Sequence, residues 1–334
     1  MPRSRVLSVL LVLFAAVIIA LPLTFGLPGA STPASATDSG DAINEIYWVV
    51  FVLAAIVFIG VEATLIVFLF RFRRRRETPP DAEGPQIHGN TRVEVVWTVV
   101  PALLLLGLAI YTFSRVPDVE ATPSSNEDVL VVDVTGHQFY WQYRYPNGAL
   151  SFDVLYLPVD RKVTLRIRSE DVPHSWWVPQ LTGKRDAIPG RTNELHFRPR
   201  ERGTFDHGVC GEFCGIQHAH MTFRVEVLGA GAFERWLDEN RQPDRVALGE
   251  QEWRASCAKC HGFQGEGDIG PAIAGNGTLT NAASLRRLLY EGQNLEANPG
   301  YMPPVGKGWT DGQIDALVAY AKSNEKLAGG ASGG

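Results

Sequence analysis

Two long apolar runs dominate the N-terminal third of the chain. The first, at 46–70, contains a single charged residue, Glu62, and as a helix with about 1.5 Å rise per residue it spans roughly 37 Å. The segment 71–76, which is rich in arginine, follows directly, and basic residues mark the cytoplasmic end of a membrane helix. A second apolar run at 93–113 returns the chain. The pattern therefore predicts a transmembrane hairpin within 37–115 and an extracytoplasmic remainder.

The first residues have the pattern of a secretory signal peptide. Arg3 and Arg5 precede the apolar stretch 6–23, and the sequence Ala34-Ser35-Ala36 offers small residues of the kind that signal peptidase cleaves after. We interpret 1–36 as a signal peptide. A retained membrane helix is the alternative, because the apolar stretch is long for a signal sequence.

After the apolar runs, the pattern changes to short segments rich in Val, Phe, Tyr and Trp. The segment 162–168 alternates apolar and polar residues, as a half-buried strand does. Turn residues at 146–148 and 189–190 separate such segments. The expected strands are 129–135, 139–145, 162–168, 194–198 and 222–228. The region 116–228 is therefore predicted to be an all-β domain, an antiparallel sandwich or small barrel.

The C-terminal part has helical periodicity instead. We expect a linker at 229–245, a small all-α domain at 246–326 and a disordered Gly-rich tail at 327–334. The last helix is predicted to begin at a capping box made by Thr310 and Gln313. The apolar stripe of this helix consists of Ile314, Leu317, Val318 and Ala321.

The composition narrows the classes of protein. The 334 residues are 45% hydrophobic and 20% charged, with a formal net charge of −5; nucleic-acid binding therefore lacks its usual basic signature. The four cysteines form two close pairs, Cys210 with Cys214 and Cys257 with Cys260. Two such pairs are too few for a disulfide framework and suit two metal or cofactor sites.

The second cysteine pair has the attachment pattern for c-type haem. In the C-x-x-C-H sequence 257–261 the two thiols bond to the haem and the adjacent His261 becomes an axial iron ligand. A zinc site would need a second ligand pair, and a thioredoxin-like site would need a βαβ setting. Met302 is the only downstream methionine, and as the other axial ligand it would favour electron transfer. The segment resembles a class I cytochrome c, which also has the pair Gly270-Pro271.

The first cysteine pair belongs to a soft ligand set. Cys210, Cys214, His218 and Met221 lie within one short stretch, and such a set selects copper over magnesium, calcium or manganese, while zinc would not need the thioether. One further histidine is expected. His174 is the candidate, because it follows a predicted strand and precedes an aromatic pair.

The pattern C-x-E-x-C-x-x-x-H-x-x-M in this stretch resembles subunit II of the haem-copper cytochrome c oxidases, which has a cupredoxin-like Greek-key fold and carries the dinuclear copper centre CuA. The ligands that the resemblance implies are the bridging thiolates of Cys210 and Cys214, the imidazoles of His174 and His218, the Met221 thioether and the main-chain carbonyl of Glu212. The Glu212 side chain would bind a Mg ion shared with subunit I. We interpret His220 as a solvated neighbour, since the family spacing selects His218.

The resemblance extends through both apolar runs. The sequence 94–101 matches the start of the second family helix, where Glu94 would lie near the entrance of a proton channel of subunit I. A plain interfacial carboxylate is the alternative. Glu62 has no family role, and we expect it to contact another subunit. The stretch 184–191 matches a family segment that packs against subunit I near the Mg ion.

Two positions depart from the family pattern. Phe139 stands where the family usually has the tryptophan that receives electrons from a separate cytochrome c, and Arg144 stands where an acid is frequent. The fused haem domain would account for both changes, because a tethered donor has a high effective concentration and needs no long-range steering by charge. Trp141 is either a relay or a structural aromatic. The whole chain thus resembles the fused subunit II of caa-type oxidases.

The resemblance implies the electron-input subunit of a proton-pumping terminal oxidase. Cytochrome c or another periplasmic donor would reduce the haem, which would reduce CuA and then haem a of subunit I, where oxygen becomes water. None of the eight histidines lies in 46–70 or 93–113, so this chain cannot hold the oxygen-reducing centre. The expected partners are subunits I and III and the bacterial inner membrane.

Three other functions share part of this signature. A CuA-containing nitric oxide reductase would use the same input subunit. A nitrous oxide reductase is disfavoured by the two membrane anchors and by the lack of histidines for a second copper cluster. A copper chaperone is disfavoured by the fused haem, because metal delivery needs no redox relay.

Overall fold

The computed structural model describes residues 32–72, 86, 88–241, 244–294 and 301–329. These residues form two compact units, one built on 41–118 and the other on 35–40 together with 119–334. The predicted signal peptide lies almost entirely outside the described residues, and its cleavage stays a prediction. The predicted tail at 327–334 is described only as far as Gly329.

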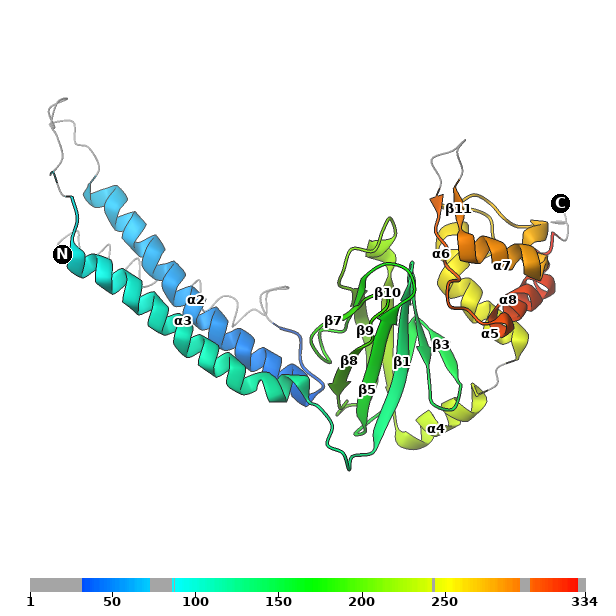
Figure 1. Ribbon diagram of the computed structural model, residues 1–334, viewed down its shortest axis with the longest axis horizontal. Coiled ribbons are helices and arrows are strands. Elements are labelled where there is room, and N and C mark those ends of the chain that lie inside the picture. The colour runs from blue at the N-terminus through cyan, green and yellow to red at the C-terminus, as the bar shows by residue number, and fades with distance from the viewer. Residues whose placement is uncertain (1–31, 73–85, 87, 242–243, 295–300, 330–334) are drawn as a thin grey trace, which may run out of the picture. The chain divides into compact units, whose positions relative to one another are not determined.

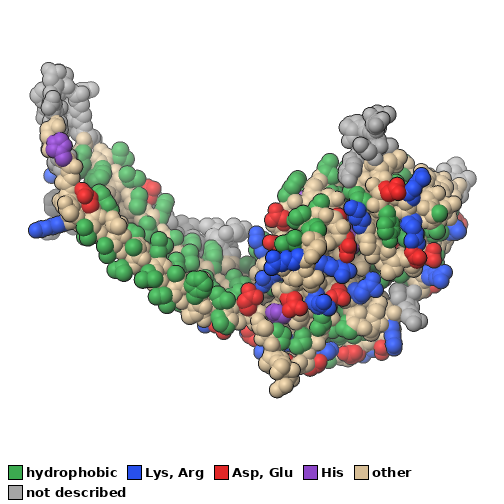
Figure 2. Space-filling view, in the orientation of Figure 1, with side chains coloured by type: hydrophobic (Ala, Val, Ile, Leu, Met, Phe, Trp, Pro, Cys, Tyr) green, Lys and Arg blue, Asp and Glu red, His purple; other side chains and the backbone are tan. Residues whose placement is uncertain are grey.

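The first unit contains two long apolar helices, α2 (Asp38–Arg71) and α3 (Thr91–Glu120). Both are long and apolar enough to cross a membrane, with mean hydropathies of 2.7 and 2.3, and Figure 2 shows hydrophobic side chains along both of them. They contain the predicted runs and extend beyond them. Arg115 of α3 forms an ion pair with Glu45 of α2, which joins the two helices as a hairpin.

The start of α3 is stabilised by a local hydrogen-bond exchange. The Asn90 side chain accepts from the backbone N–H of Val93 at 3.3 Å, and the Glu94 carboxylate accepts from the N–H of Asn90 at 2.9 Å. The pair satisfies two backbone donors that a helix start would otherwise leave free. Glu94 therefore has a structural role at the helix end, beside which its proton-uptake role stays a prediction.

The second unit begins with a sandwich of two five-stranded sheets (Figure 1). One sheet has, in spatial order, β3 (Leu150–Phe152), β2 (Tyr140–Arg144), β1 (Val129–His137), β5 (Lys162–Ser169) and β8 (Asn193–Phe197). The other has β4 (Val154–Pro158), β10 (Thr222–Leu228), β9 (Gly203–Cys210), β6 (His174–Trp177) and β7 (Arg185–Ala187). The predicted β-sandwich is confirmed, with strands at all five expected positions.

The sequence suggested an antiparallel sandwich, but the strands of the structure are not all antiparallel. Strands β1 and β5 pair in parallel, and so do β4 and β10. The reason is the order of the connections: the chain leaves β1 through β2 and β3, crosses to the other sheet as β4, and returns as β5 on the free side of β1. Crossing between sheets removes the need for a hairpin and permits parallel neighbours.

The strand β2 is buried on both faces, which is unusual for a sandwich strand near a sheet edge. Trp141 and Tyr143 belong to the core between the sheets. Tyr140 belongs instead to the apolar cluster of the C-terminal domain, together with Leu150 and Phe152 of β3. A strand covered on both sides has no polar face, so the C-terminal domain explains why this segment does not alternate.

The segment 229–245, expected to be a linker, contains the helix α4 (Ala230–Glu239). Its residues Phe233 and Leu237 are buried in the core of the β-domain, and Trp236 stacks on Tyr156 with ring centroids 4.3 Å apart. Most of the expected linker is therefore packed on the sandwich. Only the residues between Glu239 and Arg245 serve as the connection.

The C-terminal domain is mainly helical. Its elements are α5 (Arg245–Glu252), a π-helical segment (Trp253–Cys257), α6 (Ala258–His261), a 3₁₀ turn (Gly277–Thr280), α7 (Ala282–Glu291), the short strands β11 (Gln293–Asn294) and β12 (Tyr301–Met302), and α8 (Asp311–Ser323). The capping box of Thr310 and Gln313 at the start of α8 is confirmed. The four residues of its predicted apolar stripe are buried.

Candidate copper and haem sites

Strand pairing brings the distant histidine to the cysteine loop. His174 is the first residue of β6, and Cys210 is the last residue of β9. The two strands are antiparallel, with Trp176 opposite Cys210, and the N–H of Gly211 donates to the carbonyl of Ser175 at 2.7 Å. Because of this register, His174 lies at the end of the sheet where the loop 211–221 begins.

A backbone hydrogen bond joins the two ends of this loop. The N–H of Cys210 donates to the carbonyl of Met221 at 3.1 Å, directly before the pairing of β9 with β10. Between these ends, the turn 218–220 brings His218 back toward Cys214. The spacing of Cys210, Cys214, His218 and Met221 in the sequence thus corresponds to a loop between β9 and β10 whose side chains point toward one another.

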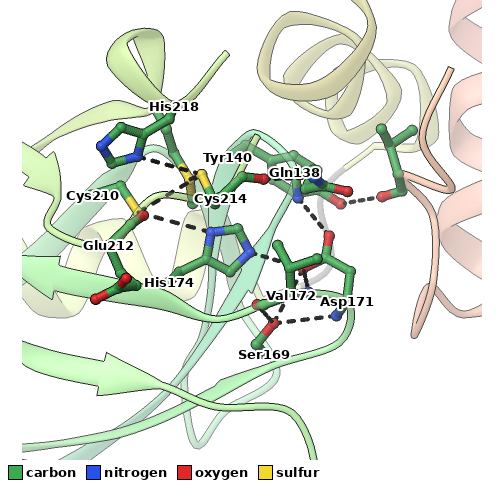
Figure 3. Close-up of polar contacts among 12 residues, drawn as sticks. Gln138, Tyr140, Ser169, Asp171, Val172, His174, Cys210, Glu212, Cys214 and His218 are labelled. Atoms are coloured by element: carbon green, nitrogen blue, oxygen red, sulfur yellow. Dashed lines mark hydrogen bonds and ion pairs between the residues drawn. The ribbon is translucent and has the colours of Figure 1, made fainter. Parts of the chain in front are cut away.

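The side chains of the loop and His174 converge on one point (Figure 3). The sulfurs of Cys210 and Cys214 are 4.0 Å apart. The Nδ1 atom of His174 is 3.8 Å from the Cys210 sulfur, and the Nδ1 atom of His218 is 3.6 Å from the Cys214 sulfur. Two thiols, each with an imidazole beside it, form a nearly symmetric set.

The weaker donors complete the cluster. The Met221 sulfur is 3.7 Å from the Cys214 sulfur, and the carbonyl oxygen of Glu212 is 3.2 Å from the Cys210 sulfur. Met221 is fully buried. All six donors predicted from the sequence are therefore together, and the soft sulfur and nitrogen set fits copper.

His174 is held by residues that the sequence reasoning missed. Its Nε2 atom lies 2.8 Å from the carboxylate of Asp171, which leaves Nδ1 for a metal, as in carboxylate–histidine–metal arrangements. The other oxygen of Asp171 accepts from the N–H of Gln138 at 2.6 Å, and the Gln138 side chain donates to the carbonyl of Cys214 at 2.6 Å. The only available signal was an acid three residues before His174.

Close packing fixes the imidazole ring of His174. Trp141 is fully buried and meets the ring edge to face, with centroids 5.8 Å apart. A Cβ added at Gly136 would lie 2.9 Å from the His174 ring, too close for any side chain. Trp141 is therefore a core aromatic in contact with a predicted ligand, and its role as an electron relay stays a prediction.

The two loop thiols share their protons unequally. The hydrogen bond between the two sulfurs lowers the pKa of Cys210 and raises the pKa of Cys214. Burial disfavours the imidazolium of His174, but Asp171 and Cys210 outweigh it and raise its pKa. Because cysteine binds a metal as the thiolate, metal binding at this pair must release thiol protons.

The haem-attachment segment shows a different environment. Burial raises the pKa of Cys257 to about 12, and burial also raises the pKa of Cys260. Both thiols are therefore protonated at neutral pH before any cofactor binds. The Nδ1 atom of His261 lies 2.7 Å from the carbonyl of Pro271, which leaves Nε2 for an iron.

The predicted pair Gly270-Pro271 does pack beside His261. A Cβ at Gly270 would lie 2.8 Å from the ring of His261, so only glycine fits there. Met302 lies in β12 and packs against the apolar cluster of the domain. These residues fit a bound haem c, and the axial role of Met302 stays a prediction.

The other side chains singled out from the sequence do not point into the cluster of copper-type donors. The side chain of Glu212 is exposed, so its Mg role stays a prediction. His220 is exposed and pairs with Gln217 at 2.6 Å, in agreement with its interpretation as a neighbour. Phe139 is buried, and Arg144 ends β2.

A hairpin of membrane-length helices, a β-sandwich with a copper-type ligand cluster and a haem-attachment domain together define a membrane-anchored electron-transfer subunit. Family models agree in three places: cytochrome c oxidase subunit II transmembrane domain at 20–114, its periplasmic domain at 153–228, and cytochrome c oxidase cbb3-type subunit III at 244–320. The chain belongs to the cytochrome c oxidase subunit II family and carries a fused C-terminal cytochrome c domain. It is thus part of a haem-copper oxidoreductase.

Individual relatives match over most of the chain. Cytochrome c oxidase subunit 2 of Alkalihalophilus pseudofirmus is 34% identical over 293 residues, which cover 81% of this chain and 84% of that protein. The protein of the same name from Bacillus subtilis is 28% identical over 335 residues, covering 89% and 93%. The solved periplasmic domain of subunit II of cytochrome oxidase from Bradyrhizobium japonicum aligns with 36% of this chain and 96% of its own, at 28% identity and a TM-score of 0.33.

Proposed function

We propose that this chain is the electron-input subunit of a terminal oxidase that reduces oxygen to water and pumps protons. When bound, the two cofactors supply one-electron chemistry: an electron enters at haem c, passes to a dinuclear CuA centre and leaves toward haem a of subunit I. The observation that carries the proposal is the convergence of three sulfur atoms, two imidazoles and one main-chain carbonyl on one point at the end of the sandwich.

The residues of the copper loop have distinct roles in this proposal. Cys210 and Cys214 would hold two copper ions through their thiolates, and His174 and His218 would each bind one of them. Met221 and the Glu212 carbonyl are the outer ligands. Because bridging thiolates share charge between two metals and a packed cluster cannot rearrange freely, little has to move when the electron arrives or leaves.

The haem domain has its own proposed ligands. Cys257 and Cys260 hold the haem covalently, while His261 and Met302 are the axial ligands. The Pro271 carbonyl orients the His261 ring through its Nδ1 atom. Two such ligands would suit the haem to electron transfer rather than to oxygen binding.

The family supports a proposal for the partners and the location. Subunits I and III surround α2 and α3 in the bacterial inner membrane, and the copper and haem domains lie outside the cytoplasm. The exposed carboxylate of Glu212 binds a Mg ion at the boundary with subunit I. Glu94 lies near the entrance of a proton channel there.

The deciding experiment isolates the intact membrane complex through a tag on this chain. An artificial one-electron donor drives the complex, with oxygen and nitric oxide offered separately. We expect rapid, cyanide-sensitive oxygen consumption, which a complex carrying Cys210→Ser should lack. Reduction of nitric oxide with negligible oxygen uptake would instead assign the chain to a nitric oxide reductase.

A further inference from the structure

The outer face of the β2–β3 hairpin is a receiving surface for the haem domain. Tyr140, Leu150 and Phe152 are buried there among residues of the C-terminal cluster. The Tyr140 hydroxyl donates to the carbonyl of Val305 at 2.9 Å and accepts from the indole N–H of Trp309 at 2.5 Å. Apolar burial with satisfied polar groups is the character of a specific interface.

One charged group of the haem domain reaches across this interface. Lys259 lies between the two haem cysteines, Cys257 and Cys260. Its Nζ atom donates to the carboxylate of Asp153 at 2.6 Å and to the carbonyl of Phe139 at 2.9 Å. The Lys259 and Asp153 side chains are only 21% and 18% exposed, so water screens their attraction less than at an open surface.

Asp153 has hydrogen bonds within the β-domain that do not involve Lys259. One of its carboxylate oxygens accepts from the backbone N–H of Trp141 at 2.8 Å, and its own N–H donates to the Trp141 carbonyl at 2.9 Å. The second oxygen is the one that faces Lys259. A carboxylate held in this way loses little conformational freedom when it binds a cation.

The other partner of Lys259 leads directly to the copper ligands. Phe139 follows Gln138, whose side chain donates to the carbonyl of Cys214 and whose N–H donates to Asp171. Asp171 in turn holds His174. The backbone of Gln138 and Phe139 therefore connects the haem-attachment segment to two predicted copper ligands. One connection leads to Cys214, and the other leads through Asp171 to His174 (Figure 3 shows the copper side).

We propose that Lys259 is a positioning residue: by binding Asp153 and the Phe139 carbonyl, it holds the haem-attachment segment at a fixed distance from the copper loop. The inference rests on the proposed function, in which an electron passes from the haem iron to the copper pair. Lys259 acts through position and does not itself carry the electron. The partner it recognises is a surface of its own chain.

The test uses the full-length, cofactor-loaded chain and the substitution Asp153→Asn. Asparagine keeps an acceptor for the Trp141 N–H and tolerates the backbone φ of 54° at this position, and it lies far in sequence from the haem cysteines. Lys259→Met is the companion variant. Lys322→Met, at an exposed position of α8, is the matched control.

A photoexcited ruthenium complex reduces the haem, and absorbance follows the electron to copper. We expect Asp153→Asn and Lys259→Met each to slow this step by about tenfold, the equilibrium change that loss of one charge-assisted hydrogen bond produces. Both redox potentials should stay unchanged, Lys322→Met should match the wild type, and the double variant should be no slower than either single one. Lys259→Arg should restore part of the rate.

A second readout reports docking without electron transfer. In Asp153→Asn, amide hydrogen exchange in β2 and β3 should become faster, while exchange in β5 should stay unchanged. An unchanged transfer rate and unchanged exchange in both variants would overturn the proposal while leaving the proposed function intact. A wild-type chain that transfers no electron from haem to copper would overturn the proposed function as well.

Discussion

The copper loop and the haem-attachment segment each hold a histidine ring, and they do so with the same devices but different partners. In both, one ring nitrogen is hydrogen-bonded and a glycine lies against the ring: Asp171 and Gly136 at His174, the Pro271 carbonyl and Gly270 at His261. The partner of His174 carries a charge, and the partner of His261 does not. The charged partner of His174 can therefore raise the basicity of its histidine more than the neutral carbonyl can.

The two sites also differ in how complete they are within the chain. The copper donors touch one another, and one thiol of the pair has a strongly lowered pKa. The haem cysteines are buried thiols with raised pKa values. A site made from neighbouring side chains can assemble by folding alone, whereas a site made around a large planar group needs that group to bring its ligands together. The substitutions below test this difference.

The largest effect is expected from Cys210→Ser. The serine hydroxyl cannot replace a bridging thiolate, so the variant should lose the paired-copper signal in electron paramagnetic resonance and all oxygen reduction. Covalent haem content should stay normal. His220→Ala, in the same loop but exposed, should keep full copper. A retained paired-copper signal in Cys210→Ser would disprove the ligand assignment.

The second prediction concerns Met302. Replacing it with alanine should leave the haem attached through its two cysteines but lower the haem potential by on the order of 0.2 V, within the roughly 0.8 V range that axial ligands span. The open position should bind added imidazole, which optical spectra would show. The copper signal should not change. An unaltered spectrum and potential would mean that Met302 is not an axial ligand.

The third prediction compares two buried carboxylates, one near each site. Hydrogen bonds from His174, Gln138 and Val172 outweigh burial and lower the pKa of Asp171. Glu252 of α5 is fully buried, and the nearby Gln313 side chain offsets only part of the cost of burying its charge. Burial raises the pKa of Glu252 from 4.5 to about 9. The first carboxylate is ionised at neutral pH, and the second is protonated.

A proton held only in the folded state makes stability fall with rising pH. Between the unfolded pKa of 4.5 and the folded pKa of about 9, Glu252 should destabilise the haem domain by about 1.4 kcal/mol per pH unit. Glu252→Gln removes this dependence, so the variant should be more stable by about 3 kcal/mol at pH 7 and equal to the wild type below pH 4.5. Denaturant unfolding followed through haem absorbance measures both.

Glu250→Gln is the matched control for this substitution. Glu250 lies on the same helix but pairs with Arg254 at the surface, where such pairs contribute roughly 0–1 kcal/mol. Its unfolding free energy should follow the wild-type pH profile. Parallel profiles for wild type and Glu252→Gln would show that Glu252 is ionised in the folded chain.

The sequence predicted the copper site better than the surroundings of that site. Five of the six donors lie in one hairpin connection, so their spacing alone indicates a ligand set, and His174 was a candidate because it follows a predicted strand and precedes an aromatic pair. Asp171 and Gln138 were missed, since a carboxylate and an amide have no pattern until the fold brings them to the ring. Long-range contacts of this kind are a property of the sheet register.

The fold, too, was predictable where a local sequence pattern indicates an element, and not where the element depends on long-range contacts. Strands that alternate, such as β5, and long apolar helices carry their own signal. β9 was missed because most of its residues are polar or exposed, and its strand conformation depends on pairing with β10 and β6. The double burial of β2 could not be foreseen, because it requires the haem domain to be present on the outer face.

The smallest effect, and the one that bears most directly on the comparison of the two histidines, is expected from Asp171→Asn. The amide keeps the shape but removes the charge that favours His174 as a donor, so copper affinity should fall by roughly 10–100-fold. Competition with a copper chelator on the full chain measures it. Asp206→Asn, an exposed acid on β9, should have no effect. Since the partner of His261 is a neutral main-chain carbonyl, an unchanged affinity in Asp171→Asn would mean that position alone, and not charge, is what both histidines receive from their partners.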